Sequence, residues 1–447
     1  MITSTAWAGQ RYVVFGLARS GRATAEALLT AGADLLVWDD DPQARAPFAG
    51  RAAIADPLAC DLTGAAGIVV SPGVPLNRHP IARHARACGV PVVGDVELFA
   101  GARAGLPRHR VVGITGTNGK STTTALVHHL LVTAGVSATM GGNIGLPILA
   151  QEPLPDGGVY VLELSSFQID LTRTLACDVA VLLNVTPDHL DRYPDFDAYA
   201  AAKARLFAMQ QPGQVAVVGT SDLPSRALAD TLRDEGRDVR TIPAVPGLDQ
   251  RRWPALQGPH NAQNAAAAIA VCNALGAGED ALMHGLQTFA GLPHRLQHIA
   301  TRHGVAFVND SKATNPASAA LALAAFPPQD GRPIVHWIVG GQAKEAGLGP
   351  LADWTAHVAV AYTIGEAGPS FAAMLADRTN VEECGTLAEA VRRAAAAATK
   401  GDVVLLSPAC ASFDQFADFE ERGRTFAALV GDAAAQDSRA AGREAGA

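Results

Sequence analysis

A glycine-rich loop at residue 116 places the strongest constraint on the fold. The chain runs through the apolar segment 111–115 into Gly116-Thr-Asn-Gly-Lys-Ser121 and continues into a segment compatible with a helix. A strand, a glycine loop and a helix in this order are typical of a phosphate-binding loop, in which backbone N–H groups surround phosphates at a helix N-terminus. Lys120 would reach the terminal phosphates and Ser121 would offer its hydroxyl to Mg²⁺. The alternative is an ordinary glycine turn with a surface lysine.

The loop departs from the general P-loop pattern by one residue. The general pattern has glycine where Ile114 stands, so this loop is the shorter variant G-T-N-G-K-S. The sequence therefore predicts ATP bound by Gly116, Thr117, Asn118, Gly119, Lys120, Ser121 and Thr122.

The chain is too long for one hydrophobic core. Its 447 residues predict about three domains at roughly 150 residues each. Segments punctuated by glycine and proline near residues 105 and 291 place the boundaries, giving domains 1–106, 107–292 and 293–447. Apolar strands alternate with Ala-rich helical segments, which predicts a well-filled α/β protein.

Charge and cysteine usage narrow the class of function. A net charge of −8 gives no basic surface for nucleic acid or an anionic membrane, so we expect neither as a partner. The six cysteines are scattered without a CxxC pair, as in a reduced cytoplasmic protein, and no apolar run is long enough to span a bilayer. We therefore expect small-molecule chemistry in the cytoplasm.

The first domain opens with a strand and a glycine turn. Gly16–Gly21 follows the apolar segment 11–15, and the next strand ends in the acidic run 39–41, as in a dinucleotide-binding domain. However, Ala18 replaces the middle glycine that lets the backbone approach a pyrophosphate, so the turn matches the NAD-binding pattern only in part. The segment Ser71-Pro-Gly73 ends a later strand, either as a plain loop or as a second phosphate contact.

Polar residues follow the strands of the central domain. Glu163 and His189 each come at or after the end of an apolar strand. Because ligands bind at the carboxyl ends of parallel strands, these side chains are predicted beside Lys120 and Ser121. An acid near a triphosphate is most simply a Mg²⁺ ligand, although a hydrogen-bonding role at the strand end is an alternative for both.

A lysine lies within the apolar stripe of the predicted helix 197–207. Tyr199, Lys203 and Phe207 share one face of that helix. Such a lysine usually extends to water. If Lys203 is buried instead, desolvation favours the neutral amine, which reacts with CO₂ to form a carbamate, an anionic oxygen ligand for a metal.

Signals are weaker after residue 210. We expect a single strand, 215–218, before an Ala-rich helix that carries Asn261 and Asn264 one turn apart. Amides at that spacing suit either helix capping or an adenine edge. Beyond residue 293, three apolar strands run into loops rich in hydroxyls and cations, which predicts a third α/β domain with ligands at that edge.

Taken together, these motifs resemble the Mur ligases of bacterial cell-wall synthesis. The loop 116–121 is shared with the wider superfamily, which includes the folylpolyglutamate synthases. The third-domain motifs are similar to those of the members that add D-glutamate: 310–315, 340–344 and 407–416. Three further motifs agree, so the resemblance covers nearly the whole chain: 141–145, 162–168 and 184–194.

The resemblance implies a fold and an activity. We expect a Rossmann-like first domain, a central P-loop-type ATPase domain with a mainly parallel sheet, and a Rossmann-like third domain. The implied monomeric enzyme adds D-glutamate to UDP-N-acetylmuramoyl-L-alanine through an acyl phosphate, a step of peptidoglycan synthesis on which cell shape and division depend. The alternatives are another amide ligase of the superfamily with a different amino acid or folate, and a nucleotide-binding module without catalysis.

The family also implies roles for individual residues. Ser121 and Glu163 match the ligands of one Mg²⁺, and His189 with carbamylated Lys203 match those of a second. The other nucleotide contacts are Asn264, Arg295 and Asp310. The UDP-sugar contacts, which replace the NAD interpretation of the first domain, are Ser20, Ser71, Gly73 and Asn143. The contacts around D-glutamate and the reacting centre are Lys312, Thr314, Lys344, Ser412, Phe413 and Phe419. The implied catalytic residues are Lys120, His189, Lys203, Lys312 and Lys344.

The sequence departs from the family pattern in two places. Asp40 and Asp41 stand where a Thr-Arg pair holds the uracil, and the segment 221–257 is shorter than usual.

Overall fold

The computed structural model describes residues 1–188, 191–343 and 347–444. The chain forms two compact units. The first contains Met1–Pro246 and Gln263–Leu286, and the second contains Gly247–Ala262 and Gln287–Ala447.

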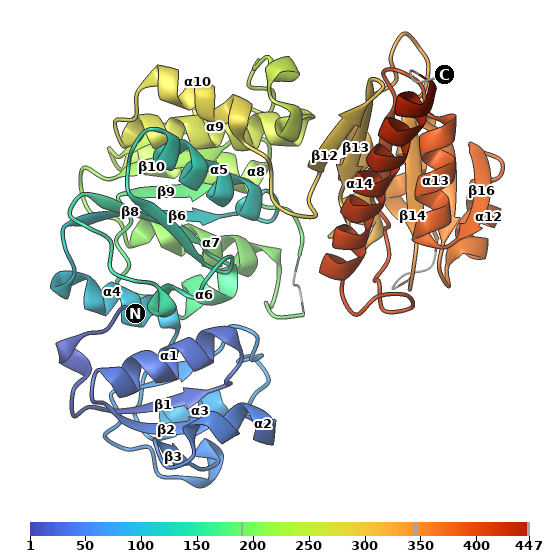
Figure 1. The fold of residues 1–447 in the computed structure, drawn as a ribbon. Coiled ribbons are helices and arrows are strands. Elements are labelled where there is room, and N and C mark those ends of the chain that lie inside the picture. The colour runs from blue at the N-terminus through green and yellow to red at the C-terminus, as the bar shows by residue number, and fades with distance from the viewer. Residues whose placement is uncertain (189–190, 344–346, 445–447) are drawn as a thin grey trace. The chain divides into compact units, whose positions relative to one another are not determined.

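The first unit begins with a five-stranded parallel sheet of order β3-β2-β1-β4-β5. Its strands are β1 Arg11–Phe15, β2 Asp34–Trp38, β3 Ala53–Ile54, β4 Gly67–Val70 and β5 Val92–Val93. Its helices are α1 Arg19–Thr30, α2 Pro42–Arg45, α3 Ile81–Ala87 and α4 Asp95–Ala102 (Figure 1). The strand order therefore reverses between β1 and β4, as at the switch point of a Rossmann fold.

Both faces of this sheet are covered. Along β1, Tyr12 and Val14 belong to one hydrophobic cluster, whereas Val13 and Phe15 belong to another. Side chains alternate between the faces of a strand, so a strand that is apolar at every position is buried on both sides. The cluster on the Val14 face continues into the next sheet through Phe99 of α4. The Phe99 ring lies edge-on to the buried ring of Tyr160, with 5.1 Å between the two ring centres.

Gly21, in the first turn of α1, has no room for a side chain. A Cβ placed on Gly21 would lie 1.8 Å from the carbonyl oxygen of Gly16, whereas a Cβ on Gly101 in α4 would meet nothing within 4 Å. We therefore expect Gly21→Ala to lower the free energy of unfolding by roughly 1–3 kcal/mol through overpacking. The matched Gly101→Ala should raise it by up to about 1 kcal/mol, because alanine is the better helix former. Urea unfolding of the two variants measures both, and equal midpoints would contradict the expectation.

The second sheet has six parallel strands of order β11-β10-β9-β6-β8-β7. The strands are β6 His109–Thr115, β7 Ala138–Gly142, β8 Gly158–Glu163, β9 Val179–Leu182, β10 Val215–Gly219 and β11 Asp238–Ile242. The helices that follow them in the chain are α5 Lys120–Thr133, α6 Ser166–Asp170, α7 Phe196–Ala208, α8 Leu223–Asp234, α9 Pro259–Ala274 and α10 Glu279–Thr288. The expectation of a single strand between residues 210 and 257 was wrong, because β11 pairs with β10 at the sheet edge. An edge strand with the sequence DVRTI lacks the apolar run that identified the others.

The second unit contains a six-stranded sheet of order β12-β13-β17-β14-β15-β16, parallel except for the edge strand β12. The strands are β12 Gln297–Arg302, β13 Val305–Asn309, β14 Val335–Gly340, β15 Val358–Ile364, β16 Asn380–Gly385 and β17 Val403–Leu406. The helices are α11 Pro316–Ala324, α12 Gly368–Leu375, α13 Leu387–Ala397 and α14 Phe419–Glu444 (Figure 1). The chain's last strand, β17, therefore lies between β13 and β14, which brings the loops after β13 and β17 together. The predicted α/β fold is confirmed, with one predominantly parallel sheet for each predicted domain.

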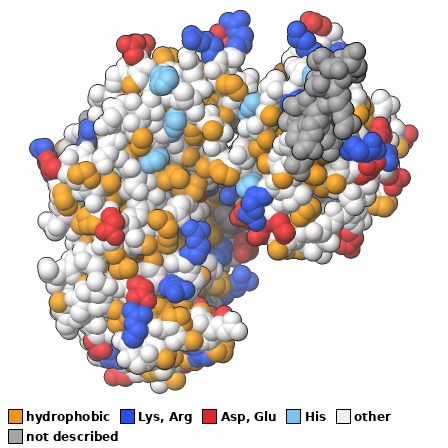
Figure 2. All heavy atoms as spheres, in the orientation of Figure 1, with side chains coloured by type: hydrophobic (Ala, Val, Ile, Leu, Met, Phe, Trp, Pro, Cys, Tyr) orange, Lys and Arg blue, Asp and Glu red, His pale blue; other side chains and the backbone are white. Residues whose placement is uncertain are grey.

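The surface mixes charged and apolar side chains. Figure 2 shows acidic, basic and hydrophobic groups interspersed over the face in view. Within the described ranges, no helix has both the length and the apolar character needed to cross a membrane.

Candidate functional site

The glycine loop connects the central strand β6 to helix α5. Gly119 caps α5 in the left-handed conformation at φ 85°, and a Cβ there would lie 2.3 Å from the Asn264 Oδ1 atom. Glycine is therefore required both by the backbone angle and by the approach of Asn264. Ile114, where a general P-loop has glycine, is fully buried in β6 and pairs with Glu163 of β8. The loop is short because the strand continues through Thr115.

Hydrogen bonds from the segment after β9 hold the loop in place. The side-chain amide of Asn184 accepts from the Asn118 backbone N–H at 2.9 Å and donates to the Asn118 carbonyl at 3.1 Å. The Thr117 hydroxyl donates to the Thr186 carbonyl at 3.1 Å and lies 3.2 Å from the Tyr199 hydroxyl. These contacts preorganise the loop, and no sequence motif had singled out Asn184 on its own.

Two lysines approach one carbonyl of the loop. Lys120 Nζ lies 2.9 Å from the Gly116 carbonyl oxygen and 2.8 Å from that of Thr117. Lys203 Nζ, on α7, donates to the same Gly116 oxygen at 3.0 Å. The loop therefore holds two amino groups close together at the carboxyl end of β6, where a nearby anionic ligand would favour their charged forms.

Lys203 does not reach water. The side chain is 1 % exposed, and its Nζ lies 4.5 Å from the centre of the Tyr199 ring. Burial, followed by the charge of Lys120, lowers the pKa of Lys203 to about 7. Of the two alternatives for this lysine, the structure shows the buried one rather than the more common extension to water, and a substantial fraction of the amine is neutral near pH 7.

Glu163 ends β8, the strand beside β6. Its side chain is buried, and its Oε1 atom accepts from the Asn143 side-chain amide at 2.9 Å. Its Oε2 atom is also buried and has no hydrogen-bond partner among the described residues. A buried carboxylate oxygen without a partner is costly unless it binds a cation, so this atom suits a metal. Among residues 1–188, 191–343 and 347–444, no group of three or more His, Cys, Asp and Glu could hold a metal.

Asn264 lies inside α9 and contacts α5. The Thr123 hydroxyl donates to Asn264 Oδ1 at 3.2 Å, so Asn264 does not cap the helix that carries it. Asn261 instead donates to the Gln257 carbonyl at 3.0 Å. Of the two alternatives for this pair, helix capping is not supported for Asn264, which lies against the glycine loop.

The glycine turn of the first sheet closes against the loop after β4. Ser71 Oγ donates to the Gly16 carbonyl at 2.9 Å. The carboxylate of Asp39, at the end of β2, accepts from the backbone N–H groups of Leu17 at 2.6 Å and Asp41 at 2.9 Å. Both oxygens of the acid that would hold an adenosine ribose are thus engaged by the backbone, which argues against the NAD interpretation.

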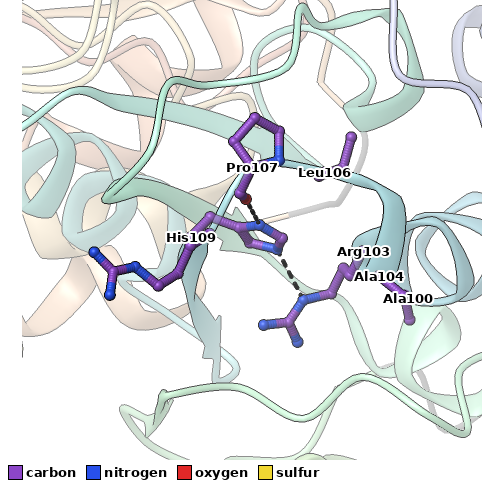
Figure 3. Close-up of a pocket in the computed structure, with 7 residues that line it drawn as sticks. Ala100, Arg103, Ala104, Leu106, Pro107 and His109 are labelled. Atoms are coloured by element: carbon purple, nitrogen blue, oxygen red, sulfur yellow. Dashed lines mark hydrogen bonds between the residues drawn. The ribbon is translucent and has the colours of Figure 1, made fainter.

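A pocket of about 330 Å³ lies away from these residues. It is lined by Ala100, Arg103, Ala104, Leu106, Pro107, Arg108 and His109. Figure 3 shows His109 between Pro107 and Arg103, with hydrogen bonds of 2.7 Å to the Pro107 carbonyl and 3.0 Å from Arg103 Nε. His109 begins β6, whereas the glycine loop follows its carboxyl end, so this pocket is not the candidate phosphate site.

In the second unit, two loops meet at the carboxyl ends of β13 and β17. Asp310 is 5 % exposed and accepts from Ser407 Oγ at 2.7 Å and from the Leu296 N–H at 3.1 Å. Burial raises the pKa of Asp310 to about 7, against the opposing effect of the Ser407 hydrogen bond. Lys312 Nζ lies 5.6 Å from the centre of the Phe419 ring, so these two predicted contacts are brought together.

An internal arginine fixes both loops of the second unit. Arg422 of α14 is 1 % exposed and donates to the Ser311 hydroxyl at 3.0 Å and to its carbonyl at 2.9 Å. It also donates to the carbonyls of Cys410 at 3.0 Å and Ala411 at 3.2 Å. Arg422 was missed in the sequence because it lies beyond the recognised motif 407–416. Directly after Ala411 in the chain, Ser412 is buried whereas Phe413 is 67 % exposed.

Two family models match the chain. Residues 114–248 match the Mur ligase middle domain, and residues 294–410 match the Mur ligase, glutamate ligase domain. A curated relative from Sphingopyxis alaskensis, named UDP-N-acetylmuramoylalanine--D-glutamate ligase, is 60 % identical over 431 residues, covering 96 % of this chain and 99 % of the relative. A relative of the same name from Novosphingobium aromaticivorans is 60 % identical over 433 residues, covering 96 % of each.

This chain belongs to the Mur ligase family. The resemblance inferred from the motifs is confirmed, and so is the expectation of an ATP-dependent ligase that forms an amide bond.

Solved Mur ligases share the fold at low sequence identity. UDP-N-acetylmuramate-alanine ligase MurC from Thermotoga maritima has a TM-score of 0.57 at 18 % identity, covering 95 % of this chain and 99 % of that one. The MurF ligase of the same organism, in complex with ADP, has a TM-score of 0.56 at 16 % identity, covering 96 % and 97 %.

The structure gathers some of the predicted Mur ligase site residues within each unit. In the first unit, Lys120, Lys203 and Asn264 lie against the glycine loop, and Asn143 contacts Glu163. In the second unit, Thr314 and Lys312 follow Asp310 in one turn. His189 and Lys344 lie outside the described residues, and both stay predictions.

Proposed function

We propose that this Mur ligase adds D-glutamate to UDP-N-acetylmuramoyl-L-alanine, with ATP as the energy source. Two near-full-length relatives at 60 % identity carry the name of that reaction. The observation in the molecule that supports it best is the buried Lys203 beside the glycine loop, because a simple nucleotide-binding module has no need of a desolvated lysine there.

The chemistry requires activation of the L-alanine carboxylate. A carboxylate is a poor electrophile at neutral pH, so its oxygen first attacks the γ-phosphorus of ATP and releases ADP. The D-glutamate amine then attacks the acyl carbon, loses a proton, and expels phosphate as the C–O bond breaks. The positive charge of Lys120, held at the loop by Gly116 and Thr117, would stabilise the negative charge of the transferring phosphoryl group.

The residues present fit a metal-dependent phosphoryl transfer. The partnerless Oε2 of Glu163 and the hydroxyl of Ser121 at the start of α5 are the oxygen ligands that Mg²⁺ prefers. Two bound Mg²⁺ ions would neutralise charge on the phosphates. We propose that Ser121 and Glu163 hold one of them, and His189 with carbamylated Lys203 the other.

A carbamate on Lys203 has a physical rationale in this site. Because the pKa of Lys203 is lowered to about 7, a substantial fraction of its amine is neutral near pH 7, and the neutral amine is the form that combines with CO₂. Conversion to a carbamate places an anion beside Lys120, where the protonated amine would be repelled by that lysine.

The remaining contacts with the substrates and the nucleotide are assigned from the family pattern. We propose that the UDP-sugar peptide contacts Ser20, Ser71, Gly73 and Asn143. The proposed nucleotide contacts outside the glycine loop are Asn264, Arg295 and Asp310. The proposed contacts of D-glutamate and the reacting centre are Lys312, Thr314, Lys344, Ser412, Phe413 and Phe419. The proposed domain limits are 1–106, 107–292 and 293–447.

A phosphate-release assay tests the reaction directly. We expect the purified protein to release phosphate from ATP when UDP-N-acetylmuramoyl-L-alanine and D-glutamate are both present. The rate of phosphate release should fall to background when either substrate is omitted. Equal turnover with L-glutamate, meso-diaminopimelate or a folate would assign the chain to another amide ligase of the superfamily. ATP binding without turnover on any of these would indicate a binding module.

A further inference from the structure

One arginine of the first unit connects two segments that the proposed function assigns to different tasks. Arg192 Nη2 donates to the Val74 carbonyl at 2.9 Å and lies 3.5 Å from that of Pro72, while Nη1 lies 3.4 Å from the Gly73 carbonyl. The guanidinium carbon also lies 4.1 Å from the centre of the Phe167 ring. Arg192 thus joins the loop 71–74 to helix α6.

The loop 71–74 is held on its other side by the glycine turn of the first sheet. Ser71 Oγ donates to the Gly16 carbonyl, and the Val74 N–H donates to the Ser71 carbonyl at 3.0 Å. A Cβ on Gly73 would meet nothing within 4 Å, so there is open space beside this residue. The loop therefore presents its carbonyls to Arg192 while space for a ligand remains at Gly73.

Helix α6 has a fixed relation to Glu163. It begins directly after β8, and a capping box between Ser165 and Gln168 sets its first turn. Phe167 in that turn is stacked with Tyr193 at 6.0 Å and an interplanar angle of 14°. The Tyr193 hydroxyl donates to Asp170 at 2.8 Å, which secures the same helix. The Phe167 ring that contacts the Arg192 guanidinium is therefore held in place four residues after Glu163, the candidate metal ligand.

We propose that Arg192 is a positioning residue for the ligation. It fixes the loop 71–74 relative to the end of β8, and so holds the UDP-sugar peptide at the correct distance from the phosphate loop. This inference rests on the proposed function, which assigns Ser71 and Gly73 to the UDP-sugar. Arginine suits the task because a planar guanidinium can donate in several directions while it stacks on an aromatic ring, which lysine cannot do.

The test compares steady-state kinetics for the two nucleotide substrates. Arg192→Ala should raise the KM for UDP-N-acetylmuramoyl-L-alanine roughly 10- to 100-fold, as expected for loss of a charged hydrogen-bond donor. The KM for ATP should change by less than about 2-fold, because the glycine loop is not touched. Arg192→Lys should restore part of the loss, since an ammonium can still donate to one carbonyl.

The matched control is Arg205→Ala. Arg205 donates to Asp170 Oδ1 at 3.2 Å and to the Thr172 carbonyl at 3.1 Å, next to the same helix, and the described residues give it no hydrogen bond to the loop 71–74. It should leave the KM for the UDP-sugar within about 2-fold. An equal rise in both variants would overturn the inference, because it would reflect a general loosening of α6.

Binding of UDP-N-acetylmuramoyl-L-alanine, measured by calorimetry, separates this inference from the proposed function. If the wild type binds the UDP-sugar but does not use D-glutamate, the proposed function fails, while weaker binding by Arg192→Ala still supports the inference. Unchanged affinity in that variant would overturn it. If Arg192→Ala does not fold, Phe167→Leu removes the aromatic support alone and should give a smaller rise in KM in the same direction. An unchanged KM in Phe167→Leu would count against the role of the stack.

Discussion

Lys203→Ala should lose roughly 100-fold or more of the ligase activity. Loss of a group that merely orients a metal ligand costs about 10- to 100-fold, and the carbamate proposed here would be a ligand itself. The amine is buried 3.0 Å from the Gly116 carbonyl, so its removal also leaves a small cavity beside the loop. Short carboxylic acids should enter that cavity, supply the missing anionic oxygens, and partly restore turnover. Phosphate release with and without added acetate or propionate measures both effects.

Controls distinguish the carbamate from a structural role of Lys203. Lys400→Ala removes an exposed lysine of the second unit and should leave the activity within about 2-fold. Full activity in Lys203→Ala would contradict the proposal. A loss of activity that no carboxylic acid relieves would also contradict it.

The pH dependence provides an independent measurement on the wild type. Burial lowers the pKa of Lys203 to about 7, so the amine is protonated below that pH and neutral above it. After removal of CO₂, the rate at which a fixed concentration of CO₂ restores activity should therefore rise as the pH increases through about 7, and then level off. A rise centred near the ordinary lysine value would show that this amine is not desolvated in solution.

The sequence predicted the site best where chemistry and periodicity coincide. The glycine loop was identifiable because a β-strand, two glycines and a helix leave few alternatives. The apolar stripe identified Lys203 as unusual, but periodicity alone favoured its extension to water, and its burial is known only from the structure. Glu163 was identifiable as a candidate metal ligand because the carboxyl ends of parallel strands share one edge of the sheet.

Other parts depend on contacts between distant segments. Asn184 and Arg422 act on backbone groups far away in the sequence, and a single sequence gives no periodic signal for such partners. Edge strands were missed for a related reason: β11 and β16 carry polar residues on exposed positions, so they lack the continuous apolar run of a central strand.

Glu163→Gln should abolish most of the turnover and change its dependence on Mg²⁺. The substitution keeps the size of the side chain, and the amide oxygen can still accept from Asn143, so the local structure should persist. It removes the negative charge from a buried group whose Oε2 atom has no hydrogen-bond partner in the described part of the chain. We therefore expect at least a roughly 100-fold loss at low Mg²⁺ that lessens as the Mg²⁺ concentration rises.

Glu97→Gln is the matched control, because the carboxylate of Glu97 is fully engaged by the protein. It accepts from the backbone N–H groups of Arg173 at 2.7 Å and Thr174 at 3.0 Å, and from the Thr174 hydroxyl at 2.9 Å. This variant should lower the stability by about 1 kcal/mol while its Mg²⁺ titration matches the wild type. If the Mg²⁺ titration of Glu163→Gln also matches that of the wild type, Glu163 Oε2 serves the fold and does not bind a metal. A metal ligand that loses its charge must bind the ion more weakly.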